Sequence, residues 1–178
     1  MSDTTTNTDT PRIYVACLAA YNNGKLHGTW IDANQDAEDI YAEINAMLAD
    51  SPEPDAEEFA IHDYEYFHGI DIHEYESIPK VAQLASLLAE HGEPFAHYLE
   101  HIGGIDEIND ETAENFEDAY YSEYDSIADF AQEMHPNLNI PEHLKSHIDW
   151  VGVAEAMFCG GWWSADSSKH TVYVFSST

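Results

Sequence analysis

The chain has 178 residues, with 35 Asp and Glu against 5 Lys and Arg, so its formal net charge is −30. This excess excludes a conventional nucleic-acid-binding protein, which needs a basic face to neutralise phosphates, and it argues against docking on anionic lipid. High net charge also favours disorder, but 44% of the residues are hydrophobic and 12% are aromatic, which indicates a folded protein.

The small number of cysteines, and the lack of an apolar signal or membrane segment in the sequence, favour a reducing compartment. Cys17 and Cys159 are too few for a disulfide framework in a chain of this length. Residues 1–10 are polar and lack the apolar core of a secretory signal, and the longest apolar stretch, near residues 151–163, is interrupted by Glu155 and by glycines. We therefore expect a cytoplasmic protein that does not enter a membrane.

The first part of the chain is rich in predicted strands. A polar, flexible leader is expected over residues 1–11. β-Forming residues then predict three strands, and apolar residues with helical spacing predict one helix. Asn22-Asn23-Gly24 has the composition of a hairpin turn. The expected elements are strands at 13–18, 26–31 and 59–67 and a helix at 36–48.

The middle of the chain is predicted to be helical, and its end is mixed. Capping residues, apolar stripes and glycine stops define helices at 77–91, 95–102, 107–120, 127–134 and 143–158. Gly160-Gly161-Trp162-Trp163 is expected to break the last helix, and residues 171–175 are expected to form a terminal strand. This order favours an α+β fold built from sequential small units.

Acidic residues are arranged along the chain in a pattern with helical spacing. No Lys or Arg lies between Lys80 and Lys145, a window with 15 Asp and Glu. On the helix expected at 107–120, six acids share a face roughly 120° wide and give about one charge per 3 Å, close to the 3.4 Å phosphate spacing of one DNA strand. These six, which we call the acidic stripe, are Glu107, Asp110, Glu111, Glu114, Glu117 and Asp118. Further candidates for phosphate-like charges are Asp36, Asp39, Glu43, Glu123 and Asp125.

Two interpretations of this acidity remain open from composition. Like charges four residues apart each destabilise a helix by about 0.2–0.5 kcal/mol, and the stripe has no basic neighbour in sequence to relieve them. Such a stripe could deceive a protein that binds DNA through Lys and Arg. Acid-rich chains also occur as salt-adapted versions of ordinary enzymes.

One motif in the chain points to catalysis. His97-Tyr98-Leu99-Glu100-His101 matches the inverted zinc-peptidase pattern H-x-x-E-H, although the chain has 11 histidines and chance matches are expected. No glycine-rich phosphate loop, nucleophile elbow or calcium loop is present in the sequence. We therefore expect no metal and no cofactor, and keep a zinc hydrolase as the alternative.

Three sequence blocks resemble the ArdA antirestriction proteins. The first block resembles the opening of that family and covers residues 14–24, followed by Leu26, Gly28 and Trp30. The second covers residues 58–65, followed by Glu74, Tyr75 and Ile78, and the third covers residues 140–144 and 148–150 with Gly160-Gly161. The leader, residues 51–55 and the middle helices depart from the family pattern.

The resemblance implies a specific function and architecture. ArdA proteins are carried on plasmids and transposons and act as DNA mimics that occupy the DNA-binding channel of type I restriction-modification enzymes, formed by their specificity and modification subunits. The resemblance also implies an elongated chain of three domains: a β-rich domain at 12–76, a central helical domain at 77–119 and an α+β dimerisation domain at 120–178. The apolar residues expected at a homodimer interface are Val151, Phe158, Trp162, Trp163 and Phe175.

The resemblance favours a non-enzymatic inhibitor that binds the restriction enzyme and not nucleic acid. Its carboxylates would stand in for phosphates, which position a protein on DNA without specifying sequence. A general acidic chaperone for basic proteins is a further alternative, besides the zinc hydrolase.

Overall fold

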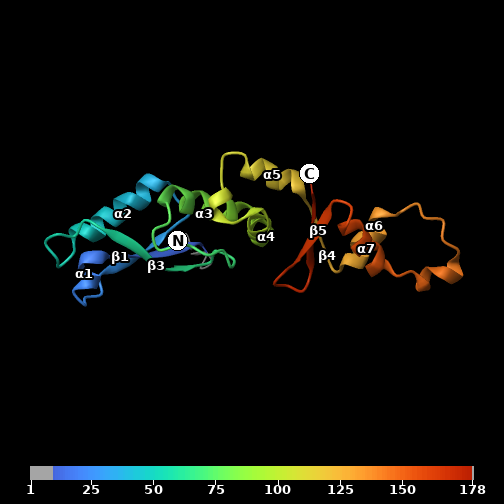
Figure 1. Cartoon of the computed structure of the whole chain (residues 1–178), viewed down its shortest axis with the longest axis horizontal. Helices are drawn as coiled ribbons and strands as arrows, with labels where there is room; N and C mark the ends of the chain where they lie inside the picture. The colour runs from blue at the N-terminus through green and yellow to red at the C-terminus, as the bar shows by residue number, and fades with distance from the viewer. Residues whose placement is uncertain (1–9, 178) are drawn as a thin grey trace, which may run out of the picture. The chain divides into compact units, whose positions relative to one another are not determined.

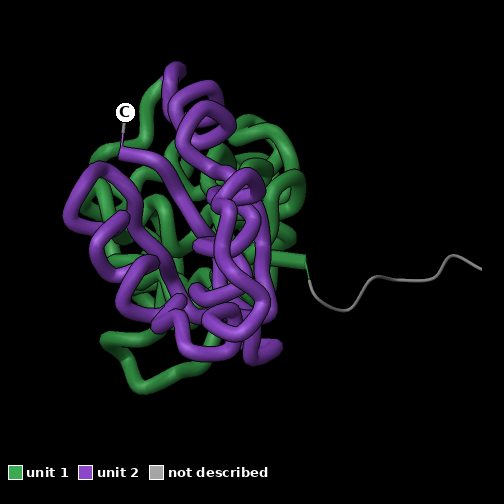
Figure 2. The backbone as a smooth tube through the Cα atoms, turned by 90° about the vertical axis from the view of Figure 1, so that its right-hand side faces the viewer, with its two compact units in different colours: residues 1–109 green, residues 110–178 purple. Residues whose placement is uncertain are grey.

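The computed structural model describes residues 10–177, so the predicted leader lies almost entirely outside the described residues. The chain divides into two compact units, residues 1–109 and 110–178, which Figure 2 shows in different colours. Each unit combines helices with strands, which confirms the α+β class. Among the described residues, no helix has both the length and the apolar composition needed to cross a membrane.

Unit 1 contains a three-stranded antiparallel sheet in the order β2-β1-β3. Its elements are β1 (Arg12–Cys17), α1 (Leu18–Asn22), β2 (Gly28–Asp32), α2 (Ala37–Ala49), β3 (Phe59–Glu65), α3 (Ile78–His91), α4 (Glu93–Ile102) and the 3-10 helix η1 (Ile105–Glu107). Figure 1 labels most of these elements and shows α2 running along the sheet. The predicted strands and the helices α2, α3 and α4 are therefore confirmed to within a few residues.

The core of unit 1 lies between one face of its sheet and the helices. Ile13, Val15 and Ile31 project from the sheet and are fully buried. The apolar stripe of α2, with Ile40 and Ile44, packs against β1 and β2. Helix α2 in turn contacts α3, which contacts α4. The spacing of apolar residues along α2 thus decides which of its faces is left for charge.

The hairpin turn predicted at Asn22-Asn23-Gly24 is wrong in kind. A short helix, α1, follows β1 directly, and its end is closed by hydrogen bonds from the Asn23 and Gly24 N–H groups to the carbonyls of Ala20 and Tyr21. Gly24 adopts φ +73°, the left-handed conformation with which glycine ends helices. The same residues that favour a hairpin turn therefore terminate a helix here.

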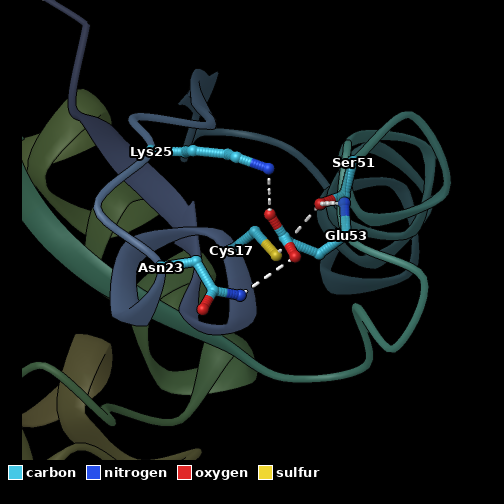
Figure 3. Close-up of polar contacts among 5 residues, drawn as sticks. All are labelled: Cys17, Asn23, Lys25, Ser51 and Glu53. Atoms are coloured by element: carbon cyan, nitrogen blue, oxygen red, sulfur yellow. Dashed lines mark hydrogen bonds and ion pairs between the residues drawn. The ribbon is translucent and has the colours of Figure 1, made fainter.

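A polar clamp ties the segment after α2 to the loop after α1. Lys25 Nζ lies 2.5 Å from Glu53 Oε1, and Asn23 Nδ2 donates to Glu53 Oε2 over 2.9 Å. Ser51 Oγ accepts from the Glu53 N–H and lies 3.4 Å from Cys17 Sγ. Figure 3 shows Asn23 and Lys25 converging on the Glu53 carboxylate. The clamp holds residues 51–55, where the sequence departs from the ArdA pattern.

The clamp predicts a pH dependence. The hydrogen bond from Lys25, with its positive charge and the Asn23 hydrogen bond, lowers the pKa of the Glu53 carboxyl below its ordinary 4.5. A lowered native pKa means that this stabilisation is present above the unfolded pKa and is lost as pH falls through the folded one. Glu53→Gln should therefore melt below the wild type at pH 7, and the gap should close as pH falls below 4.5. Thermal melts across pH would show it, with exposed Glu57→Gln as the control that changes little.

Unit 2 contains a second antiparallel sheet, in the order β4-β6-β5. Its elements are α5 (Thr112–Ala119), β4 (Tyr120–Tyr124), α6 (Ile127–Met134), the 3-10 helix η2 (Glu142–His147), α7 (Trp150–Phe158), β5 (Trp162–Asp166) and β6 (Val172–Ser176). Helix α6 and the terminal strand are where they were predicted. The helix predicted at 143–158 is wrong in extent, because Ile148 is extended and separates η2 from α7.

Strands β4 and β5 were not predicted from the sequence. β4 lies where the sequence predicts the end of a helix and the loop after it, and β5 begins at the Trp162-Trp163 pair, where the sequence predicts only a helix break. Both strands pair with β6, which follows them in the sequence. The structure divides into two units, and the division into three domains at 77 and 120 stays a prediction.

Candidate acidic interaction surface

The acidic side chains lie on the exposed surface of both units. Among the described residues no Asp or Glu is buried, and only Glu53, Glu65, Glu76 and Glu93 are half-buried. All eleven residues predicted to imitate phosphates are exposed: Asp36, Asp39, Glu43, Glu107, Asp110, Glu111, Glu114, Glu117, Asp118, Glu123 and Asp125. The charge is therefore available to a partner.

Helix α2 presents the first group of these acids. Asp36 is its N-terminal capping residue, and Asp39 and Glu43 follow at spacings that place all three on one side of the helix. The Glu43 carboxylate accepts a hydrogen bond of 2.7 Å from Gln35 Nε2. Asp39 lies in the first turn, where the positive end of the helix dipole stabilises an acid, whereas Glu43 lies about one turn further along.

The acidic stripe does not lie on one helix, and the helix predicted over 107–120 is wrong. Glu107 ends η1, Ile108 is extended, and α5 begins only at Thr112. Ile105 and Ile108 are buried in unit 1, where the Asn109 carbonyl accepts from Gln83 Nε2. The division between the units falls directly after Asn109. The competing contacts to unit 1 break the helix that the acid spacing predicted.

Helix α5 nevertheless keeps a charged face. Glu111 at its N-terminus, Glu114, Glu117 and Asp118 lie on one side, and the buried Thr112, Phe116 and Ala119 lie on the other. Four charges over a rise of roughly 10 Å still give about one per 3 Å, comparable with one strand of B-DNA. This shorter helix therefore has about the charge spacing that the sequence predicted.

The strand after α5 extends the acidic surface. Glu123 lies in β4 and accepts a hydrogen bond from Thr171 Oγ1, and the exposed Asp125 follows the strand. Between them, Tyr124 donates its phenol to Glu133 Oε1 over 2.9 Å. Burial, followed by this carboxylate, raises the pKa of the Tyr124 phenol, which therefore stays neutral. The Glu123 carboxylate is thus positioned by the sheet and by its hydrogen bond from Thr171.

Four of the five Lys and Arg residues pair with acids outside the predicted set. Ion pairs join Arg12 to Glu65, Lys25 to Glu53, Lys80 to Asp106 and Lys145 to Glu142. None of these four acids belongs to the predicted phosphate-like set. Intramolecular salt bridges to Lys and Arg therefore leave that set's negative charge in place in the described part of the chain.

The histidine motif does not assemble a metal site in the described residues. His97, Glu100 and His101 lie on α4, where His97 Nε2 is 3.8 Å from Glu93 Oε1 in the preceding turn. Within residues 10–177, no three His, Cys, Asp or Glu side chains converge in a way that could hold a metal ion. The motif therefore lacks the third protein ligand that a catalytic zinc site needs.

The residues predicted for a dimer interface differ in their exposure. Val151 on α7 is 45% exposed, whereas Phe175 is fully buried and stacks on Trp163 with ring centres 3.9 Å apart. Phe158 and Trp162 pack on the buried Phe130. Phe175 is therefore a core residue of its own chain and offers no surface, which corrects its assignment to the interface.

Sequence reasoning missed a second cluster on the outer face of the sheet in unit 1. The strand register places its members in two adjacent rows on the face away from the core. We call Arg12, Tyr14, Trp30, Asp32, Asp63 and Glu65 the outer-face cluster. The alternation of these residues with buried ones along β1 and β2 is the signal that could have found it.

The comparison with known families agrees with the resemblance seen in the sequence. The family model described as antirestriction protein (ArdA) matches residues 13–168. No curated protein matches the chain.

Proposed function

The chain belongs to the ArdA family of antirestriction proteins, and on that premise we propose that it is a non-enzymatic DNA mimic. It occupies the DNA-binding channel of a type I restriction-modification enzyme, formed by the specificity and modification subunits. By excluding DNA, it blocks restriction of incoming mobile DNA, and modification as well.

One observation carries this proposal: the helix α5 presents exposed carboxylates at about the charge spacing of one DNA strand. Glu114, Glu117 and Asp118 form none of the salt bridges of the described residues, and the buried side of α5 holds these acids on a folded surface. A charged surface that is already ordered loses little conformational entropy on binding. A basic channel that recognises phosphates without reading bases would accept it.

Competition measures the proposed function directly. The protein should displace duplex DNA from a type I methyltransferase, and rising salt should weaken the complex because the contacts are ionic. It should bind no DNA itself at low salt, since its net charge of −30 repels the polyanion. Histones serve as the basic control, because equal binding to histones and methyltransferase would indicate a general acidic chaperone. Failure to displace DNA would contradict the proposal.

We also propose that two chains form a homodimer through unit 2. Supporting this, Leu138, Leu144 and Val151 are exposed apolar residues of unit 2. Unit 2 also has an open, largely apolar groove along α7, lined by Ile148, Val153 and Met157 among others. Exposed apolar side chains and an open apolar groove are features that association surfaces use.

The dimer should respond to salt in the opposite direction from the complex with the enzyme. Two chains of charge −30 repel each other, and salt screens this repulsion. We therefore expect the dimer to tighten as ionic strength rises, measured by sedimentation. Val151→Asp should weaken it, whereas Tyr41→Asp, exposed in unit 1, should not. Dissociation of the wild-type dimer on adding salt would refute an apolar interface.

A further inference from the structure

The outer-face cluster already holds one guanidinium group. Arg12 Nε and Nη2 donate to Glu65 Oε2 over 2.8 Å and 2.5 Å. The Arg12 Cζ atom lies 4.7 Å from the centre of the Trp30 ring and 6.0 Å from that of Tyr66. A carboxylate and an aromatic face together match the two ways in which proteins bind guanidinium. Arg12 is the only arginine of the chain. Its guanidinium is an internal ligand that shows how the cluster can bind this group.

The aromatic part of the cluster is held in place by close packing. The rings of Tyr14 and Trp30 are 5.5 Å apart, and Trp30 is 37% exposed. A side chain at Gly28 would meet Tyr14 Oη at 2.8 Å and the Val15 carbonyl at 2.5 Å. The missing side chain at Gly28 thus lets the Tyr14 ring lie close to the sheet. The ring pair is part of the folded surface and need not be ordered on binding.

Two further carboxylates neighbour this ring pair in the strand register. Asp32 lies opposite Arg12 in the strand register, and Asp63 lies opposite Tyr14. Both are exposed, and no described Lys or Arg forms an ion pair with either. One oxygen of each is anchored by a backbone N–H, that of Asn34 for Asp32 and that of Tyr64 for Asp63. Asp32 and Asp63 therefore provide further carboxylates near the same rings, of the kind with which Glu65 binds Arg12.

We propose that the outer-face cluster is a docking site for arginine side chains of a basic partner protein, and that it prefers arginine to lysine. The inference rests on the proposed function, because the partner is the same DNA-binding enzyme. Arginine is favoured because its planar, weakly hydrated guanidinium stacks on rings and pairs with carboxylates in a fork, whereas the lysine ammonium is a compact, strongly hydrated charge. The one aromatic residue of α5, Phe116, is buried, so no ring of that helix lies exposed beside its acids. We therefore expect the acids of α5 to attract arginine and lysine alike.

Two peptides test the preference without the restriction enzyme. The full-length protein is titrated with hexa-arginine and with hexa-lysine at one ionic strength, and the dissociation constants are measured by calorimetry. The wild type should bind hexa-arginine roughly two- to fivefold more tightly, the range expected for an exposed cation–π contact. Trp30→Ala should bring the ratio close to one. Tyr41→Ala, which removes an exposed ring from α2, should keep it.

A second pair of variants tests the internal ligand. Arg12→Ala frees the Trp30 ring and the Glu65 carboxylate, so it should tighten binding of hexa-arginine. Lys169→Ala changes the net charge equally in the other unit and should tighten it less. Thermal melts check that each variant is folded.

The outcomes separate this inference from the proposed function. Equal binding of the two peptides by the wild type, or an arginine preference that Trp30→Ala leaves intact, would overturn the inference, while inhibition of the enzyme would still stand. A preference that depends on Trp30 in a protein that fails to displace DNA would support the site and overturn the proposed function.

Discussion

Replacing all six acids of the acidic stripe by their amides is expected to weaken displacement of DNA from the methyltransferase by between about tenfold and 10⁴-fold. Each exposed ion pair with a target Lys or Arg contributes about 0.2–1 kcal/mol, and six of them add to roughly 1–6 kcal/mol. The single change Glu114→Gln should cost less than about tenfold for the same reason. A competition assay with duplex DNA measures both variants.

A control of equal charge distinguishes a local surface from overall acidity. Amide substitutions at six exposed acids outside the predicted set give the same net charge, 5 − 29 = −24. Suitable positions are Asp55, Glu57, Glu58, Glu90, Glu155 and Asp166. The stripe variant should inhibit much less well than this control. Equal inhibition by the two would show that total charge decides binding and that the stripe has no special role.

The stripe variant should also be no less stable than the wild type. Glu114 and Asp118 lie four residues apart within α5, and a like-charge pair at this spacing costs a helix about 0.2–0.5 kcal/mol. A catalytic site behaves differently, because its residues act as a unit and one substitution can abolish activity. Complete loss of inhibition in the folded Glu114→Gln variant would therefore contradict a distributed charge mimic.

The sequence predicts local elements well where one apolar pattern has one possible partner. Strand β1 and helix α2 were located within about a residue, because Ile13, Val15, Ile40 and Ile44 have the period of their own element and pack on each other. Residues 120–124 and 162–166 could not be recognised in this way. Each pairs with β6, and their aromatic residues are half-buried in that sheet or exposed beside it. Strand identity here depends on a partner distant in sequence.

The acidic site was predictable in its residues but not in its backbone. Exposure of Glu114 and Asp118 follows from the helical spacing that places them opposite Phe116. The break before α5 does not follow from spacing, because Ile108 is fixed by burial in unit 1 and Phe116 belongs to unit 2. Tertiary contacts override a local helical pattern when its two ends belong to different cores.

The stability of unit 2 should depend strongly on one ring, that of Phe130. Phe130 lies on α6, is fully buried, and has the rings of Tyr121, Tyr124, Phe158 and Trp162 within 5.2–6.2 Å. Truncating it removes the contact shared by β4, α7 and β5. Phe130→Ala is therefore expected to cost about 3–5 kcal/mol, the usual range for a buried phenylalanine. For a unit of this size the melting temperature should fall by more than about 12 °C.

A matched substitution in unit 1 shows whether the two cores are energetically separate. Phe95 on α4 is also fully buried, and Phe95→Ala should cost a similar free energy. Because Phe95 belongs to unit 1 and Phe130 to unit 2, calorimetry should show each variant lowering the transition of its own unit, with the other transition little changed. The acids on α5 depend on the core of unit 2 through Phe116, which stacks on Tyr120. Inhibition should therefore fail at a lower temperature in Phe130→Ala than in Phe95→Ala, and the reverse order would place the functional acids on unit 1.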